Sequence, residues 1–422
     1  MAAGASCALS PGRDSEEGDE NGLAATAIVN ARVCTASEGR GIPLWIDGAT
    51  VLFEGGKITA VGTGVPVPEE ARIIDASGKI VTPGLIDAHC HIGISEDGAG
   101  WAGDDGNEAS DPVTAEVRAL DGINPKDIAY EDAVASGITC VQVDPGSANI
   151  IGGETLVMKT WGSAVVEDLV LKRPSGLKAA LGENPKRVYG TQRKMPTTRL
   201  GNAATLRKAL YAAKDYMRKK ETAKEPDKSP ELSLRHESIA RVLRKEIPLR
   251  IHCHRADDIM TALRIAREFG IDISIEHATE GDRVADRILE SGFPVTMGPS
   301  LTDKSKLEVK DIGFAAPVAV SKAGVKLAII TDHPVLPIQY LRICAGLAVR
   351  EGMDEDVAIL AITRYAAEIA GVADRVGSLD PGKDADIVVW SKDPLEYDAK
   401  CEHVFVDGVE VKAKSEKDGD PR

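Results

Sequence analysis

The chain has 422 residues, of which 43% are hydrophobic, so it is long enough for one barrel-sized domain and a second, smaller one. Its formal net charge of −15 argues against binding nucleic acid or an anionic membrane through a general electrostatic field, but it still allows a small anionic substrate. Seven cysteines without a CxxC pair, and no apolar run of about 18 residues, indicate a reduced, cytoplasmic protein without a membrane span.

Short strands separated by glycine turns are expected near both ends of the chain. Residues 1–24 are rich in Ser, Gly, Asp and Glu, which is typical of a disordered acidic tail. Residues 25–82 contain short strands separated by glycine turns, and the pattern returns at 376–415, before a short tail at 416–422. We therefore expect 25–82 and 376–415 to form one small β-sandwich, and the residues between them (83–375) to form a separate domain.

Residues 83–375 alternate between strand-like and helix-like segments. Continuous apolar strands that alternate with helices predict a parallel sheet covered on both faces. About eight such units in this length predict a (β/α)₈ TIM barrel. The expected strands are 85–91, 138–146, 155–160, 177–184, 249–254, 271–277, 294–298 and 325–332. The expected helices are 205–220, 232–245, 260–269 and 283–291.

Histidines and an aspartate stand where these strands end. The first strand ends in His89-Cys90-His91, so His89 and His91 share one strand face, about 6 to 7 Å apart along the chain. Two imidazoles in that arrangement suit a divalent metal such as zinc. Barrel enzymes place their chemistry at the C-terminal ends of strands, which predicts one shared metal site. The other strand-end residues are His252, His254, His277 and Asp332.

At these residues the chain resembles the metal-dependent amidohydrolase superfamily, over about residues 25–412. The barrel matches are PGLIDAHCH (83–91), His252, His277 and Asp332 in TDHP, and the sandwich matches are GSLDPGKDADIVVW (377–390) and VFVDGVEV (404–411). Within the superfamily, HCHRADDI (252–259) and IEHATEG (275–281) most resemble the imidazolonepropionase-like branch. That branch includes cyclic-amide hydrolases and peptidases that act on prolyl or arginyl dipeptides.

The resemblance implies an amidohydrolase that cleaves a C–N bond in a small amide, cyclic amide or dipeptide rather than in long peptides. One or two divalent ions, zinc first among the candidates, would lower the pKa of a bound water to about 7 and so supply hydroxide. Asp332 would contact the metal, accept the proton of that water and deliver it to the leaving nitrogen. The implied metal-binding histidines are His89, His91, His252 and His277.

Two further residues have more than one interpretation. His254 lies on the same strand face as His252, where it would either support the ligands, stabilise an oxyanion or serve the fold. Arg255 would either bind a substrate carboxylate with its planar guanidinium or form a surface ion pair with Asp257 or Asp258.

A site with two metals also needs an anionic bridge, commonly a carboxylated Lys or a Glu at a middle strand end. The segment 177–184 offers both, Lys178 near its start and Glu183 at its end. Glu183 is favoured if the ends of all strands lie at the same height in the barrel, because the other expected ligands stand at strand ends. Lys178 lies earlier in its strand, but its long side chain could still extend to the metal site. Glu183 could instead cap the helix that follows.

Two competing functions are a deaminase of a small heterocycle and a non-catalytic scaffold. Some deaminating relatives have an acid shortly after the fifth-strand histidine, and His254-Arg255 takes that place here. Some scaffold relatives have lost metal ligands, whereas all of the implied ligands are present in this chain. The sequence leaves the substrate open beyond a small molecule, and it leaves a homo-oligomer possible.

Overall fold

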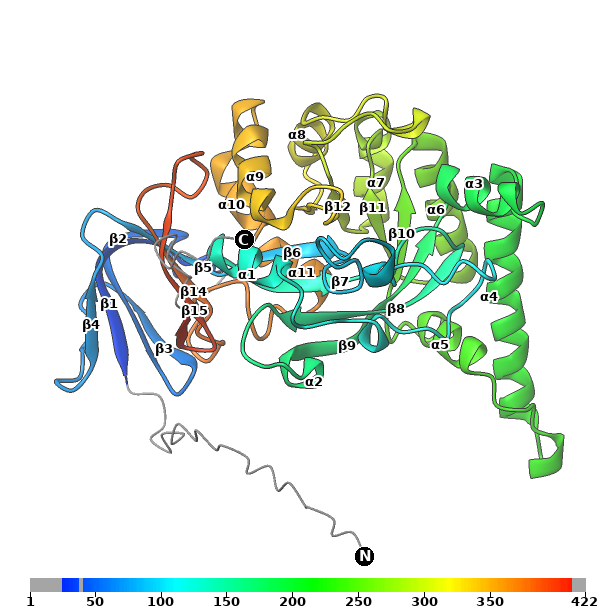
Figure 1. Ribbon diagram of the computed structural model, residues 1–422, viewed down its shortest axis with the longest axis horizontal. Coiled ribbons are helices and arrows are strands. Elements are labelled where there is room, and N and C mark those ends of the chain that lie inside the picture. Colours follow the sequence, from blue (N-terminus) through cyan, green and yellow to red (C-terminus); the bar gives the residue numbers. More distant parts are fainter. Residues whose placement is uncertain (1–24, 38–40, 412–422) are drawn as a thin grey trace, which may run out of the picture.

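The protein, described here by a computed structural model of residues 25–37 and 41–411, is an α/β structure with two eight-stranded sheets (Figure 1). One sheet is a nearly closed barrel formed by the middle of the chain, and the other is built from both chain ends. The prediction of a TIM barrel with a second sheet shared by the two ends is therefore confirmed. The predicted tails at 1–24 and 416–422 lie outside the described residues.

The second sheet has the strand order β16-β15-β14-β5-β1-β2-β3, with β4 paired to β1. The two chain ends meet where β14 runs antiparallel to β5, with Trp390 opposite Ile80. The rings of Phe53 and Phe405, one from each end, pack edge to face at 5.0 Å. The strands are β1 (Thr26–Cys34), β2 (Trp45–Glu54), β3 (Lys57–Gly62), β4 (Arg72–Asp75), β5 (Ile80–Pro83), β14 (Ile387–Trp390), β15 (Cys401–Val406) and β16 (Val409–Val411).

The barrel strands follow one another in chain order from β6 to β13. The chain leaving β6 and the chain leaving β13 are joined by a hydrogen bond of 2.8 Å from the His91 N–H to the His333 carbonyl. The strands are β6 (Leu85–Cys90), β7 (Ile138–Val143), β8 (Ile151–Lys159), β9 (Val170–Ala180), β10 (Leu249–Cys253), β11 (Ile273–His277), β12 (Val295–Met297) and β13 (Leu327–Ile329).

Strand β8 departs from the parallel arrangement that the sequence predicted. It runs antiparallel to both β7 and β9. Only residues 144–150 connect β7 to β8. A crossover between parallel strands needs a dozen or more residues, so this short connection can only return the chain antiparallel.

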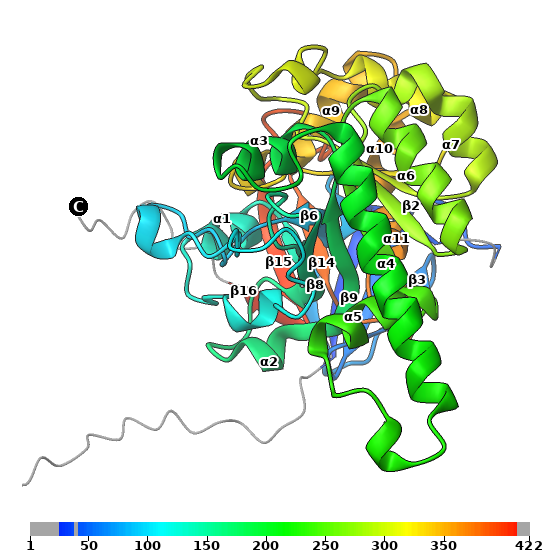
Figure 2. The same cartoon turned by 90° about the vertical axis from the view of Figure 1, so that its right-hand side faces the viewer.

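Helices surround the barrel, and the longest of them, α4, lies beside α5 and α6 (Figure 2). The side chain of Thr198 caps α4 by accepting a hydrogen bond of 3.0 Å from the Gly201 N–H. Among the described residues no helix is both long and apolar enough to cross a membrane. The helices are α1 (Ala129–Ala135), α2 (Val166–Leu169), α3 (Glu183–Thr191), α4 (Arg199–Thr222), α5 (Leu234–Leu243), α6 (Ala256–Phe269), α7 (Ala285–Ser291), α8 (Ala315–Lys322), α9 (Leu341–Arg350), α10 (Glu355–Ala361) and α11 (Arg364–Ala370).

The end of β9 lies earlier than the sequence predicted. The strand stops at Ala180, and Gly182 turns the chain with a φ of +84°, a conformation that side chains disfavour. A Cβ at Gly182 would also lie 2.7 Å from Glu308 Oε2. Glu183 therefore begins α3, whereas Lys178 remains inside the strand.

A buried lysine joins the barrel to the second sheet. Lys159, at the end of β8, is 3% exposed, and its Nζ lies 2.6 Å from Asp386, 3.1 Å from Asp384 and 3.1 Å from Asp407. Burial opposes the charged form, but the three carboxylates outweigh it and raise the pKa of Lys159. This ionic contact therefore links the barrel to the C-terminal part of the second sheet.

Candidate metal centre

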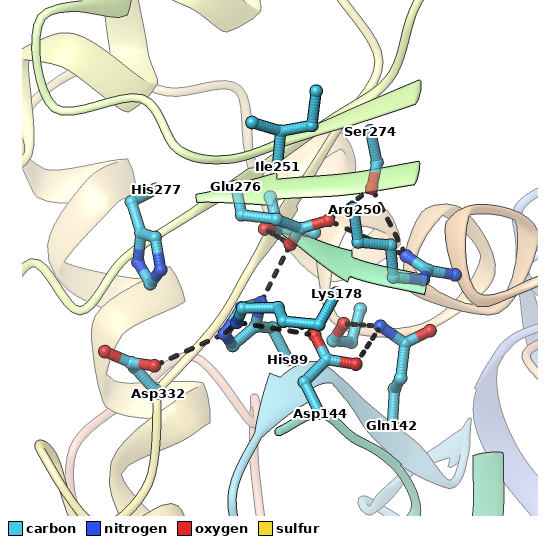
Figure 3. Close-up of polar contacts among 12 residues, drawn as sticks. His89, Gln142, Asp144, Lys178, Arg250, Ile251, Ser274, Glu276, His277 and Asp332 are labelled. Carbon is cyan, nitrogen blue, oxygen red and sulfur yellow. Dashed lines mark hydrogen bonds and ion pairs between the residues drawn. The ribbon is translucent and has the colours of Figure 1, made fainter. Parts of the chain in front are cut away.

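Side chains from β6, β9, β10 and β11 and from the loop after β13 converge inside the barrel (Figure 3). Among the described residues, potential ligand atoms lie within 4.8 Å of one another in three groups, and the first two contain every strand-end histidine predicted from the sequence. The groups are His252, His254 and His277; His89, His91 and Asp332; and His89, Asp144 and Glu276.

Asp332 lies between the two histidines of the first strand. Its Oδ1 is 3.4 Å from His89 Nε2 and 3.2 Å from His91 Nε2. Asp332 has a φ of 56°, and His277 has a φ of 75°. Both are in the left-handed region, which is uncommon for residues other than glycine, so both side chains leave the direction of their strands. The surrounding barrel holds this strained backbone in place.

Three of the histidines have the same ring nitrogen tied to an acceptor. His91 Nδ1 donates to the Asp144 carbonyl at 2.6 Å, His277 Nδ1 to the Gly298 carbonyl at 2.7 Å, and His89 Nδ1 to Glu276 Oε2 at 2.9 Å. Because carbonyl and carboxylate oxygens only accept, each Nδ1 carries a proton, and Nε2 is the nitrogen that has the lone pair when the ring is neutral. The rings are therefore preset in the tautomer that binds a metal through Nε2.

Two of the buried rings have a nitrogen without a hydrogen-bond partner among the described residues. Among the described residues, buried His277 Nε2 and His252 Nδ1 have no hydrogen bond. Burial lowers the pKa of His277 to about 3, and burial, followed by nearby cations, lowers the pKa of His252 well below its usual value. Neutral, buried and unpaired imidazoles are the state in which histidine binds a cation, so these residues fit a divalent metal.

The electrostatics of His89 support the same conclusion. Burial and the charge of Lys178 disfavour protonation of this ring. Nearby carboxylates outweigh them and raise the pKa of His89 to about 9. The surroundings of His89 therefore favour a positive charge at this ring, and a metal cation can supply that charge in place of the Nε2 proton.

Lys178 is placed among the histidines, and Glu183 is not. Lys178 is 1% exposed, with Nζ 3.0 Å from His89 Nε2 and 4.0 Å from Asp144 Oδ2. Glu183 is half-buried at the start of α3 and lines a separate outer cavity of about 290 Å³. The earlier end of β9 explains the difference, because Glu183 has already left the barrel.

Arg255 lines that same outer cavity. Its guanidinium makes two hydrogen bonds of 2.9 Å to Asp257, which is one of the two surface ion pairs considered from the sequence. The structure does not bring Arg255 to the cavity above the histidines. His254 does line that cavity, and its Nδ1 lies 2.8 Å from the Thr279 hydroxyl.

The cavity above the histidines has a volume of about 260 Å³. Ligand pockets usually measure roughly 300–1,000 Å³, so this one suits a small substrate. Its floor includes His91, His252, His254 and Asp332, and one wall includes Asn184, Arg187 and Lys306.

Sequence reasoning missed Glu276, which is fully buried beneath His89. Strand alternation places a neighbour of His277 on the opposite face, yet β10–β11 pairing aligns Glu276 with His252 inside the barrel. The kinked backbone of His277 lets both residues face inward. A carboxylate directly before the strand-end His277 was the signal available in the sequence.

The surroundings of Glu276 keep it ionised. The hydroxyls of Ser274 and Thr296 donate to its carboxylate, and Arg250 Nη1 lies 3.7 Å away (Figure 3). Burial alone would raise the pKa of Glu276, but the bond with His89 and the charges of His89 and Arg250 hold it below its usual range. Asp144, which follows β7, was also missed, although it obeys the strand-end rule that found the histidines.

Comparisons with known proteins find similarity to amidohydrolases. The amidohydrolase family matches residues 183–411. Amidohydrolase tasK of Hapsidospora irregularis is 30% identical over 401 residues, or 89% of this chain, and this chain spans 41% of that relative. An imidazolonepropionase of Acidiphilium cryptum is 24% identical over 87% of this chain and 93% of that protein. The crystal structure of an amidohydrolase from Thermotoga maritima MSB8 superposes with a TM-score of 0.87 at 45% identity, over 92% of this chain and 100% of that one.

Proposed function

Because the chain belongs to the amidohydrolase family, in its imidazolonepropionase-like branch, we propose that it hydrolyses a C–N bond in a small amide, cyclic amide or dipeptide with the help of bound metal. The observation that carries the proposal is the convergence of buried, neutral imidazoles with unpaired nitrogens around Asp332. The small volume of the cavity, about 260 Å³, supports a small substrate.

We propose that His89, His91, His252 and His277 hold one or two divalent ions, with zinc first among the candidates. Nε2 of His277 and Nδ1 of His252 are the unpaired buried atoms that would face an ion. When bound, such an ion supplies Lewis-acid polarisation of the scissile carbonyl and lowers the pKa of water. The hydrogen bonds to the Nδ1 atoms of His89, His91 and His277 fix the ring orientations before an ion arrives.

Asp332 is the proposed proton carrier. Burial disfavours its charged form, but the nearby histidines, His277 first, hold the pKa of Asp332 well below its usual value. The carboxylate is therefore ionised and can accept a proton from water at the cavity floor. After bond cleavage it can return that proton to the leaving nitrogen. The strained φ of Asp332 keeps Oδ1 near both His89 and His91.

Lys178 is the stronger candidate for an anionic bridge between two ions. Its side chain is buried beside His89, and its charge is among those that lower the pKa of His252 and His277, after burial itself. Carboxylation of Nζ would replace this cation by an anion among neutral rings. Glu183 lies in the outer cavity, so only a large movement of α3 would bring it to these rings.

His254 is proposed to contact the substrate. Its Nδ1 is held by Thr279, and the ring lines the cavity, which leaves Nε2 for an oxygen of the substrate. Burial, followed by the neighbouring cations, lowers the pKa of His254 well below its usual value, so the ring is neutral.

The test is hydrolysis of a panel of N-acyl amino acids, dipeptides and cyclic amides by protein of measured metal content. Product amines and acids are separated by chromatography, and ammonia is measured in parallel with nucleobases and guanidines. We expect metal-dependent release of amine from at least one panel member and none with Asp332→Asn. Ammonia release from a heterocycle alone would establish the deaminase instead, and absence of both with metal present would favour the scaffold.

A further inference from the structure

One face of helix α3 is part of the wall of the cavity above the histidines. Asn184 and Arg187 both line the cavity, and residues three apart lie on one side of a helix. Arg187 also lines the neighbouring outer cavity, so its side chain stands between the two. The amide Nδ2 of Asn184 lies 3.4 Å from Nε2 of His252, so this helix face adjoins the proposed metal ligands. Arg187 is exposed and makes no hydrogen bond or ion pair with any described residue. Its guanidinium is therefore free to bind a ligand in the cavity.

Lys306, in the loop before the short helix Leu307–Val309, faces the same wall. Its Nζ lies 2.9 Å from Asn184 Oδ1 and 2.9 Å from Glu308 Oε1, and its side chain is 19% exposed. An ammonium group has three N–H donors, so two are used and one remains for the cavity. Because Asn184 holds Lys306 and shares a helix face with Arg187, the two cations flank the same part of the wall.

The charges on this side of the cavity do not cancel. Glu308 is shared between Lys306 and Arg199, at 2.9 and 3.4 Å. Asp258 takes a further hydrogen bond of 2.9 Å from Arg199. No carboxylate of the described residues lies within ion-pair distance of Arg187, so its positive charge is not paired on this wall. This is unusual in a chain whose formal net charge is −15.

We propose that Arg187 and Lys306 bind a carboxylate of the substrate, so that the enzyme prefers N-acyl amino acids or dipeptides with a free carboxylate over neutral amides. The proposal rests on the proposed hydrolase function. Arg187 offers the planar fork that matches a carboxylate, and Lys306 offers its third N–H. The cavity of about 260 Å³ keeps that carboxylate within a few bonds of the scissile C–N bond. Asp303 also lines this cavity and carries a negative charge. It is exposed, so solvent and salt screen its repulsion of a substrate carboxylate.

The kinetic test compares each active panel member as free acid and as C-terminal carboxamide, with metal-loaded enzyme. Arg187→Gln and Lys306→Met should each raise KM for the acid by about 10- to 100-fold, the range for losing a hydrogen bond to a charged group. They should change kcat and the KM for the carboxamide little. Arg255→Gln is the matched control, because Arg255 lies outside this cavity and pairs with Asp257.

A second control separates charge from loop damage. Asp303→Asn alters the same rim but removes an opposing charge, so KM for the acid should stay unchanged or fall. Equal KM rises for acid and carboxamide in Arg187→Gln, or a rise in Arg255→Gln or Asp303→Asn as large as in Arg187→Gln, would overturn the proposal.

A binding measurement keeps this test independent of activity. N-acetylglycine and N-acetylglycinamide are titrated into metal-loaded enzyme by calorimetry, with wild type and Arg187→Gln compared. We expect wild type to bind the acid about tenfold more tightly than the amide, and Arg187→Gln to lose that preference. Equal binding of both probes to wild type would overturn the carboxylate site even if hydrolysis is found. No hydrolysis of any panel member, together with a retained preference for the acid, would overturn the hydrolase proposal alone.

Discussion

Replacing Glu276 by Gln tests whether the carboxylate beneath His89 prepares that ring for metal. Glu276 Oε2 accepts the Nδ1 proton of His89 at 2.9 Å, which orients the ring so that Nε2 is the nitrogen available to a metal. The amide of Gln has one oxygen and one NH₂ group, so it holds the ring less firmly and without charge. The same change removes the counter-charge of the buried Arg250, 3.7 Å away.

Two effects of different size follow from this geometry. Loss of a group that orients a metal ligand lowers metal affinity by about 10- to 100-fold. Removing one partner of a buried ion pair costs roughly 3–5 kcal/mol of unfolding free energy. Arg250 keeps hydrogen bonds to the carbonyls of Ser175 and Ile369, at 3.4 and 3.0 Å, so we expect the lower end of that range.

The two effects separate in a double variant. Arg250→Met with Glu276→Gln removes both charges, so most of the lost stability should return while metal affinity stays low. Metal affinity is measured by competition with a chromophoric chelator, and stability by denaturant unfolding of metal-free protein. Glu280→Gln is the control, because Glu280 lies just after β11 and accepts from Ala256 and Arg283 instead of a histidine. Wild-type affinity in Glu276→Gln, or full recovery of affinity in the double variant, would refute the reasoning.

Further predictions concern the bridge, the proton carrier and acid stability. Lys178→Ala should lower the metal content by about half or more, whereas Glu183→Gln should leave it unchanged; metal analysis showing the reverse would return the bridge to Glu183. Asp332→Asn should keep the fold and much of the metal but lower kcat by several orders of magnitude, and near-normal turnover would remove Asp332 from the mechanism. Burial opposes the charge of Asp384, but its bond with Arg375 and the charge of Lys159 lower its pKa from 3.8 to about 2. Its stabilising contribution is therefore present above about pH 4 and lost as pH falls towards 2, so Asp384→Asn should flatten this part of the melting-temperature profile, and an unchanged profile would contradict it.

The histidines and Asp332 could be predicted from the sequence because one rule places them. Barrel strands can be recognised in the sequence as short apolar runs, and a polar residue at the C-terminal end of such a strand is expected to face the reaction site. Asp144 obeys the same rule. Glu276 does not, because only the pairing of β11 with β10 and the left-handed backbone of His277 turn it inward.

The proposed bridge was harder to place from the sequence because the segment 177–184 contains Leu, Ala and Gly, which suit either a strand or a turn into a helix. Strand β9 pairs with β10, with Lys178 opposite Arg250, and this pairing ends at Ala180. That pairing is a contact between residues far apart in the chain. The sequence offered Arg255 for a substrate carboxylate, and only the structure shows that Arg255 pairs with Asp257, whereas Arg187 has no partner among the described residues.

The most direct test of the central claim is amine release by one protein preparation before and after metal removal. We predict that chelator-treated enzyme loses activity on its best small amide substrate and regains it on addition of Zn²⁺ or Mn²⁺. Asp332→Asn treated in the same way should take up metal without regaining activity. Equal amine release by metal-free and metal-loaded wild type would contradict the account.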